Sequence, residues 1–224
     1  MKKLVLIVLL AVSLSAFAQE EQFAQSFFKE KIENMSHGQQ DSLEIIMNVL
    51  ETSFRKQQVK SIGGIDFGIS REEALIKLRN KYGSPVYNPE SPSLTFENVK
   101  YAGHDFSSAV FLFDSDGTKS YLSTCIFVNK AKTRSEALTI MEGLKKDLEI
   151  RYVISSFDGE NGFPVYYGGV SPFWDGNLAN LEEEDFIAWH MDVFEYDQDL
   201  VKVFGNKYGV RLVYGPYNYV KEEF

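Results

Sequence analysis

A helix-start motif that occurs twice is the feature of this sequence that most constrains its fold. Ser70-Arg71-Glu72-Glu73-Ala74-Leu75 is followed 63 residues later by Thr133-Arg134-Ser135-Glu136-Ala137-Leu138. In both copies a hydroxyl residue stands three positions before a Glu. This is the spacing of a capping box, in which each of the two side chains satisfies a free backbone N–H group of the other residue. The motif therefore predicts two capped helices, beginning at residues 71 and 134.

The two predicted helices end in different ways. The first is expected to run to about Tyr82, because Gly83 suits the left-handed position that follows a helix. The second keeps apolar residues in helical phase at Met141 and Leu148, and is expected to reach about Arg151.

Strand-like segments follow each helix. Residues 94–102, 106–114 and 119–128 alternate between polar and apolar and are rich in β-branched and aromatic side chains. Strict alternation in the third segment places Cys125 on one face of the sheet and Leu122 on the other. The segments after the second helix are 152–157, 163–170, 186–196, 199–204 and 208–214. Residues 199–204 also fit the start of a helix. A helix followed by an antiparallel meander, found twice, predicts an α+β fold made of two similar units.

Residues 20–60 are predicted to be helical. One apolar stripe recurs at helical spacing, at Leu43, Ile46, Met47, Leu50 and Phe54. Asp41 and Glu44 stand where the N-cap and its N3 acid are expected for this helix. An earlier, shorter helix is expected to end at Ser36-His37-Gly38. These N-terminal helices need a partner surface that covers their apolar stripes.

The first 18 residues have the pattern of a secretory signal peptide. Lys2 and Lys3 precede the apolar run Leu4–Leu14, and Ala16-Phe17-Ala18 provides a cleavage site before Gln19. The run is shorter than the roughly 20 apolar residues of a spanning helix. No later segment reaches that length. We therefore expect an exported bacterial protein, periplasmic or secreted, with no transmembrane segment after the signal is removed. Its expected parts are 19–60, 61–130 and 131–224.

Charge and cysteine content exclude several classes of function. The chain holds 23 Lys and Arg against 32 Asp and Glu, and residues 133–224 carry 8 basic and 17 acidic side chains. This balance argues against a nucleic-acid partner, which requires a phosphate-neutralising surface. The lone Cys excludes an intramolecular disulfide framework and any cysteine-rich metal site.

The segment around the first helix resembles a known family. Gly68-Ile69-Ser70-Arg71-Glu72-Glu73-Ala74, ending in Gly83-Ser84-Pro85, is similar to the helix signature of the β-lactamase-inhibitor-protein-like fold, which the small outer-membrane-assembly lipoproteins of bacteria share. The resemblance implies one or two units of a helix packed on an antiparallel sheet that act as protein-binding modules. The chain departs from the family in having a longer helix and no lipidated Cys. No binding residue is transferred from it.

No assembled catalytic or metal-binding motif is present. His37, His104 and His190 are scattered along the chain, and no phosphate-binding loop, dinucleotide fingerprint or nucleophile elbow occurs. We therefore expect no catalytic residues, no metal and no cofactor. The most enzyme-like pair is His190 and Asp192, which share one side of a predicted strand. A general base oriented by a carboxylate has this pattern, and so does the polar face of any half-buried strand.

An aromatic segment followed by an acidic segment is the other candidate for binding. Residues 163–174 include Tyr166, Tyr167, Phe173 and Trp174, and residues 182–185 include Glu183 and Asp185. The aromatic side chains are those that stack on sugars or anchor a partner protein, or they form a core edge between the two halves. The acidic residues are a solvated surface, a docking surface for a basic partner or a calcium site of low affinity.

The sequence therefore predicts a non-enzymatic binding protein whose partner is a protein or an envelope or glycan component. The expected binding residues are Tyr166, Tyr167, Phe173, Trp174, Glu183, Asp185, His190 and Asp192. One alternative is a carbohydrate-binding protein or hydrolase that uses His190, Asp192 and nearby carboxylates. Another is a structural domain that pairs with a second copy of itself.

Overall fold

The structure is a computed structural model that describes residues 37–86, 92–115, 117, 119–178, 185 and 187–218. In these ranges the helices are α3 (His37–Gln57), α4 (Arg71–Tyr82), α5 (Arg134–Glu149) and α6 (Gln198–Phe204). Strands β1 (Ser61–Ile62) and β2 (Ile65–Asp66) form a small hairpin. The longer strands are β3 (Leu94–Tyr101), β4 (His104–Ser115), β5 (Ser120–Ala131), β6 (Ile154–Asp158), β7 (Pro164–Gly168), β8 (Trp189–Glu195) and β9 (Tyr208–Tyr214). The expected signal peptide and first short helix lie outside the described residues.

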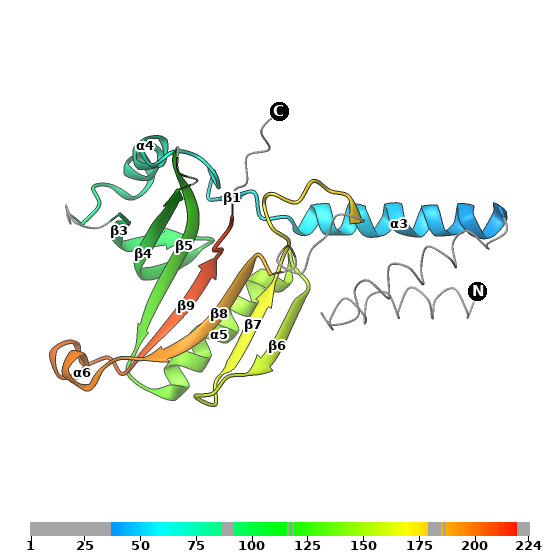
Figure 1. Ribbon diagram of the computed structural model, residues 1–224. Coiled ribbons are helices and arrows are strands. Elements are labelled where there is room, and N and C mark those ends of the chain that lie inside the picture. The colour runs from blue at the N-terminus through cyan, green and yellow to red at the C-terminus, as the bar shows by residue number, and fades with distance from the viewer. Residues whose placement is uncertain are drawn as a thin grey trace.

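Seven strands form one antiparallel sheet in the order β3-β4-β5-β9-β8-β7-β6 (Figure 1). The meander β3–β5 and the meander β6–β9 meet where β5 pairs with β9. Cys125 lies opposite Tyr214 at one end of this junction, and Ala131 lies opposite Tyr208 at the other. The structure thus confirms the predicted α+β class and most of the predicted strands.

Helices α4 and α5 cover the same face of the sheet. On that face a row of register partners, Phe111, Cys125, Tyr214 and Trp189, runs across β4, β5, β9 and β8 with at most 1% exposure. The buried residues of the two helices belong to the same core cluster: Ala74 and Leu78 from α4, and Ala137, Met141 and Leu144 from α5. Figure 1 shows α5 behind β8 and β9. One continuous core therefore lies between two helices and one sheet.

The first predicted helix is confirmed at both ends. The Ser70 hydroxyl accepts a hydrogen bond from the Glu73 N–H at 3.3 Å, and the Glu73 carboxylate accepts one from the Ser70 N–H at 3.3 Å. At the other end Gly83, with φ of 84°, donates its N–H to the Arg79 carbonyl. A side chain other than glycine would be strained at this φ, so the glycine stops the helix at Tyr82.

The second predicted helix needs two corrections. Thr133 accepts the Glu136 N–H at 3.2 Å, but the Glu136 carboxylate accepts the N–H of Lys132, at 2.7 Å, and so only half of the capping box forms. The helix also ends at Glu149, two residues before the expected Arg151. Arg151 and Tyr152 both donate their N–H groups to the Leu148 carbonyl, which closes the helix with a tight turn.

Residues 198–204 form helix α6 and not the strand that was predicted over 199–204. The Asp197 carboxylate accepts the Asp199 N–H at 2.8 Å, which caps the helix start. Gly205, with φ of 69°, ends the helix by donating its N–H to the Val201 carbonyl. These local hydrogen bonds outweigh the β-branched composition of the segment.

The predicted alternation along β5 is wrong at Leu122, which is completely buried in the core. Thr124 pairs with Leu112 of β4, whereas Leu122 pairs with the next residue, Phe113. Ser123 is therefore an extra residue in β5. A bulge of this kind shifts the side-chain phase by one and turns Leu122 toward the same face as Cys125.

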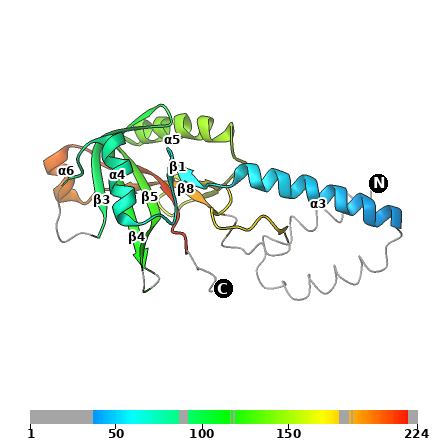
Figure 2. The same cartoon turned by 90° about the horizontal axis from the view of Figure 1, so that it is seen from above.

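Helix α3 extends away from the sheet, as both views show (Figures 1 and 2). It begins at His37 and not at the predicted cap, Asp41. Its last turn is fixed to the loop after β7. The Phe54 ring packs edge-on against that of Trp174, with 6.1 Å between the ring centroids, and Arg55 Nη2 donates a hydrogen bond to the Gly176 carbonyl at 3.0 Å. Within the described ranges, no helix is both long enough and apolar enough to cross a membrane.

Candidate functional site

Three of the four predicted aromatic binding residues pack in or against the core. Tyr166 is 8% exposed and donates its hydroxyl hydrogen bond to Glu142 at 2.8 Å. Trp174 is 5% exposed and packs under the end of α3, while Phe173 is half-buried against the core. As folded, Tyr166 and Trp174 offer little surface to a partner. Tyr167 is the exception and is half-exposed.

Of the two predicted acidic residues, only Asp185 lies in the part of the chain that the structure describes. Glu183 falls outside the described residues. Asp185 accepts the Ser171 N–H with its backbone carbonyl at 2.8 Å, which joins the two ends of the loop that follows β7. In the part of the chain that the structure describes, no three His, Cys, Asp or Glu side chains gather to hold a metal ion.

The face of the sheet opposite α4 and α5 carries a row of side chains that crosses five strands. It joins register partners from β4, β5, β9, β8 and β7, and we call it the sheet stripe: Val110, Ile126, Val213, His190 and Tyr167. Val213 is 6% exposed and the other four are half-exposed. Directly paired residues on one sheet face lie roughly 4.5–5.5 Å apart at Cβ, so the stripe is continuous. Among the described residues, no helix packs on this face.

An ion pair lies beside the sheet stripe. Arg211 of β9 and Asp192 of β8 are register partners, and Arg211 donates from Nε to Oδ1 at 2.8 Å and from Nη2 to Oδ2 at 2.5 Å. Both oxygens of Asp192 are thus bound to the guanidinium. In the described part of the chain Asp192 makes no hydrogen bond to His190. His190 and Asp192 therefore share one open face of the sheet, as predicted, but the Asp192 carboxylate is hydrogen-bonded to Arg211 and not to His190.

His190 is held in its uncharged form. Burial lowers the pKa of His190 below its ordinary value of 6.5. The charge of Arg211 lowers this pKa further, whereas that of Asp192 opposes the shift. At neutral pH the sheet stripe therefore carries no net charge, and it combines apolar side chains with one imidazole and one phenol.

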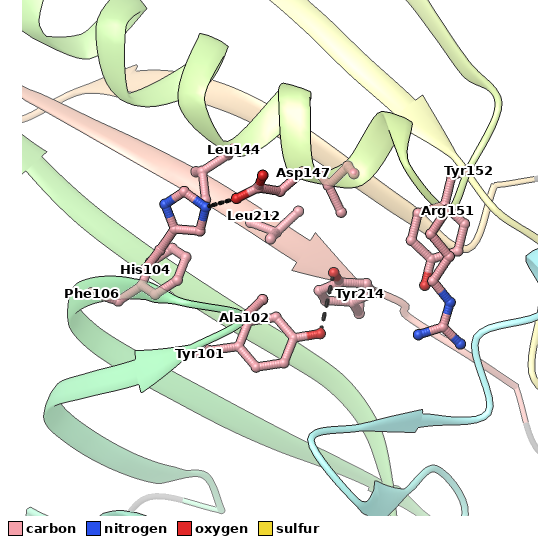
Figure 3. Close-up of a pocket in the computed structure, with 11 residues that line it drawn as sticks. Tyr101, Ala102, His104, Phe106, Leu144, Asp147, Arg151, Tyr152, Leu212 and Tyr214 are labelled. Carbon is pink, nitrogen blue, oxygen red and sulfur yellow. Dashed lines mark hydrogen bonds and ion pairs between the residues drawn. The ribbon is translucent and has the colours of Figure 1, made fainter.

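A small pocket lies on the helix side of the sheet, between α5 and the β3–β4 turn (Figure 3). Its volume is about 110 Å³. We call it the α5 pocket. It is lined by Tyr101, Ala102, His104, Phe106, Leu144, Asp147, Leu148, Arg151, Tyr152, Leu212 and Tyr214. His104 Nε2 lies 2.6 Å from Asp147 Oδ2, which joins the turn to the helix.

Neither the sheet stripe nor the α5 pocket could be predicted from the sequence, for different reasons. Alternation along β5 and β9 places Ile126 and Val213 on one side of each strand, but only the β5–β9 pairing aligns them with His190 and Tyr167. The α5 pocket combines residues from a turn, a helix and the last strand. No spacing in the sequence marks such a combination.

Comparison of the chain with protein-family models, with curated proteins and with solved structures found no match.

Proposed function

We propose that this chain is an exported, non-enzymatic protein that binds another protein through the open face of its sheet. The observation that carries the proposal is the sheet stripe, four of whose five residues are half-exposed, on a sheet whose other face already holds α4 and α5. Export rests on the predicted signal peptide over residues 1–18.

The chemistry of this face suits protein recognition. Tyr and Arg are enriched at the centres of protein interfaces, and the face presents Tyr167 and Arg211 beside aliphatic side chains. The side chains stand on five neighbouring strands of one hydrogen-bonded sheet, so little backbone freedom is lost when a partner binds. Because the Arg211 charge is neutralised by Asp192, the expected partner surface is apolar and aromatic at its centre.

We also infer that the sheet was built from two related units, 61–130 and 131–224. The supporting observation is the arrangement around the β5–β9 junction. In each unit a helix precedes a meander whose last strand lies at the junction, and the two last strands are antiparallel. A two-fold axis perpendicular to the sheet at this junction would relate α4-β3-β4-β5 to α5-β7-β8-β9. It would also place both helices on the same face.

A glycan partner is the alternative. The ring centroids of Tyr167 and Phe157 lie 6.0 Å apart, and Phe157, on the edge strand β6, is 57% exposed. Exposed aromatic rings of this kind can stack on sugar rings. The hydrolase form of this alternative requires a catalytic carboxylate. Asp192 does not fill that role readily while both of its oxygens accept hydrogen bonds from Arg211.

The test is partner capture from envelope extract with matched variants. Ile126→Glu places a charge in the sheet stripe, next to its central residue Val213. Ile76→Glu makes the same change at an exposed position of α4, where the native side chain is 63% exposed. We expect wild type and Ile76→Glu to recover the same protein, and Ile126→Glu to lose it.

Three other results would count against the proposal. Equal capture by all three proteins would show that the partner binds elsewhere. Binding to a glycan array that Tyr167→Ala abolishes would favour the glycan alternative. Self-association in light scattering that Ile126→Glu abolishes would favour a second copy of the chain as the occupant of this face.

A further inference from the structure

The α5 pocket has a hydrogen-bond donor with no acceptor. Tyr101 and Tyr214 place their hydroxyl oxygens 3.4 Å apart, and the Tyr101 hydroxyl donates to that of Tyr214 (Figure 3). Two hydroxyl groups that share one hydrogen bond have one proton left over, and in the described part of the chain no group accepts it. Tyr214 is 1% exposed, so this proton is also shielded from bulk water. A buried donor without an acceptor is costly unless a ligand satisfies it.

Both tyrosines keep their protons at neutral pH. Burial raises the pKa of Tyr101 to about 12, and it raises the pKa of Tyr214 well above its ordinary value. They therefore act as donors and not as phenolates. A ligand that completes this site needs an oxygen that accepts hydrogen bonds.

The charge at this end of the pocket favours an anion. Arg151, just beyond the end of α5, makes no ion pair within the described ranges. Its positive charge acts on the Tyr101 hydroxyl group, whose pKa it lowers against the larger effect of burial. The carboxylate in the lining, Asp147, is bound to His104 at 2.6 Å. Figure 3 shows the His104–Asp147 pair and Arg151 at opposite ends of the pocket, with the two hydroxyls between them.

Apart from the hydroxyl group of Tyr152, the rest of the lining is apolar, and it limits the ligand's size. Phe106, Leu144, Leu148 and Leu212 form much of the wall. A volume of about 110 Å³ is smaller than the roughly 150 Å³ cavity that accommodates benzene. A short aliphatic chain fits this space, whereas a sugar ring or a nucleotide does not.

We propose that the α5 pocket binds the carboxylate of a short aliphatic acid, with the carboxylate between Arg151 and the Tyr101–Tyr214 hydroxyls and the chain against the leucine wall. The carboxylate comes from a free acid or from the C-terminus of a peptide that ends in a small apolar residue. This site is on the opposite side of the sheet from the sheet stripe, and it does not depend on the function proposed there.

The test is an NMR titration of the ¹⁵N-labelled mature chain with butyrate, butylammonium and a tripeptide that ends in valine, with a free or an amidated C-terminus. We expect saturable amide shifts at Ala102, Gly103 and residues 148–152. The dissociation constant for butyrate is expected to be on the order of 1 mM. Butylammonium and the amidated peptide should give no such shifts. Saturation by butyrate identifies a free acid as a sufficient ligand, and saturation by the free peptide alone identifies a C-terminus.

Three variants separate binding from folding. Arg151→Gln removes an exposed charge and should weaken carboxylate binding by about tenfold, which is the effect expected from the loss of one charge-assisted hydrogen bond. Lys146→Gln makes the same charge change within α5, at a residue that does not line the pocket, and should bind like wild type. Ile126→Glu, on the other face of the sheet, should also bind normally.

The proposal fails if neither carboxylate gives saturable shifts at about ten times the expected dissociation constant. It also fails if butylammonium shifts the same amides to the same extent. Equal affinities for wild type and Arg151→Gln would overturn the assigned role of the guanidinium.

Discussion

Arg211 on β9 holds Asp192 on β8 by two parallel hydrogen bonds across a register pair on the open face of the sheet. The Asp192 side chain is 19% exposed and that of Arg211 is 40% exposed. The pair is therefore better shielded than the chain's surface ion pairs, such as Lys202 and Asp199, whose side chains are 73% and 86% exposed. The two pairs should contribute differently to stability.

Arg211→Gln should lower the free energy of unfolding by about 1–2 kcal/mol, because a two-point charged hydrogen bond is lost and Asp192 keeps its desolvation penalty. Lys202→Gln should change the free energy by less than about 0.5 kcal/mol, as expected for an exposed pair. Urea denaturation at neutral pH measures both. Similar losses of unfolding free energy in the two variants would show that the lower exposure of the Arg211–Asp192 pair does not make it more stabilising.

Acidification should destabilise the fold through His190. Its pKa is lower in the folded chain than its ordinary 6.5, mainly because it is buried, so the unfolded chain binds the proton more readily. Stability therefore falls as the pH drops through about 6.5 toward the folded pKa. His190→Gln should flatten this part of the stability–pH curve. An NMR titration should place the His190 midpoint below 6.5, and a midpoint above 6.5 would refute the assignment.

Ala102→Asn should stabilise the chain. Ala102 has a φ of 51° in the two-residue turn between β3 and β4, where it precedes Gly103 with φ of 86°. Asn tolerates this left-handed region better than Ala does, and Asn-Gly suits such a hairpin turn. We expect a gain of about 0.5–1 kcal/mol in thermal or urea unfolding. Ala102→Val, which adds a β-branched side chain at the same φ, should have the opposite effect.

Cys125 should be inert to thiol reagents while the chain is folded. The side chain is completely buried, and burial raises the pKa of the thiol, so little of the reactive thiolate forms. Absorbance with a disulfide reagent should detect one thiol in denaturant and none in native buffer over the same period. Rapid reaction in native buffer would indicate that β5 opens locally.

The features that were predicted correctly depend on neighbours in sequence. The cap at Ser70, the stop at Gly83 and the shared face of His190 and Asp192 all follow from spacings of a few residues. The errors arose where two local tendencies compete. Asp197 and Gly205 favour a helix over a β-rich segment, and the extra residue Ser123 changes which way Leu122 points.

The candidate sites were less accessible from sequence, since they depend on long-range pairing. The pairing of Ile126 with Val213, and of Val213 with His190, is set by the junction of β5 and β9. The aromatic segment was ambiguous because Tyr166 and Tyr167 are adjacent, so that one faces the core and the other faces outward. The position of helix α5, which covers one face of the sheet, decides that Tyr166 is the residue that faces the core.

The placement of β9 between β5 and β8 also affects the order of assembly. Among the described strands β9 comes last in the chain, yet it lies in the middle of the sheet, so its neighbours β5 and β8 each keep unpaired backbone groups until β9 joins them. Synthesis produces β9 after both of its partner strands, and pairing Ala131 with Tyr208 closes a long loop, which slows folding. A product truncated before Tyr208 would expose two bare strand edges and would be expected to aggregate.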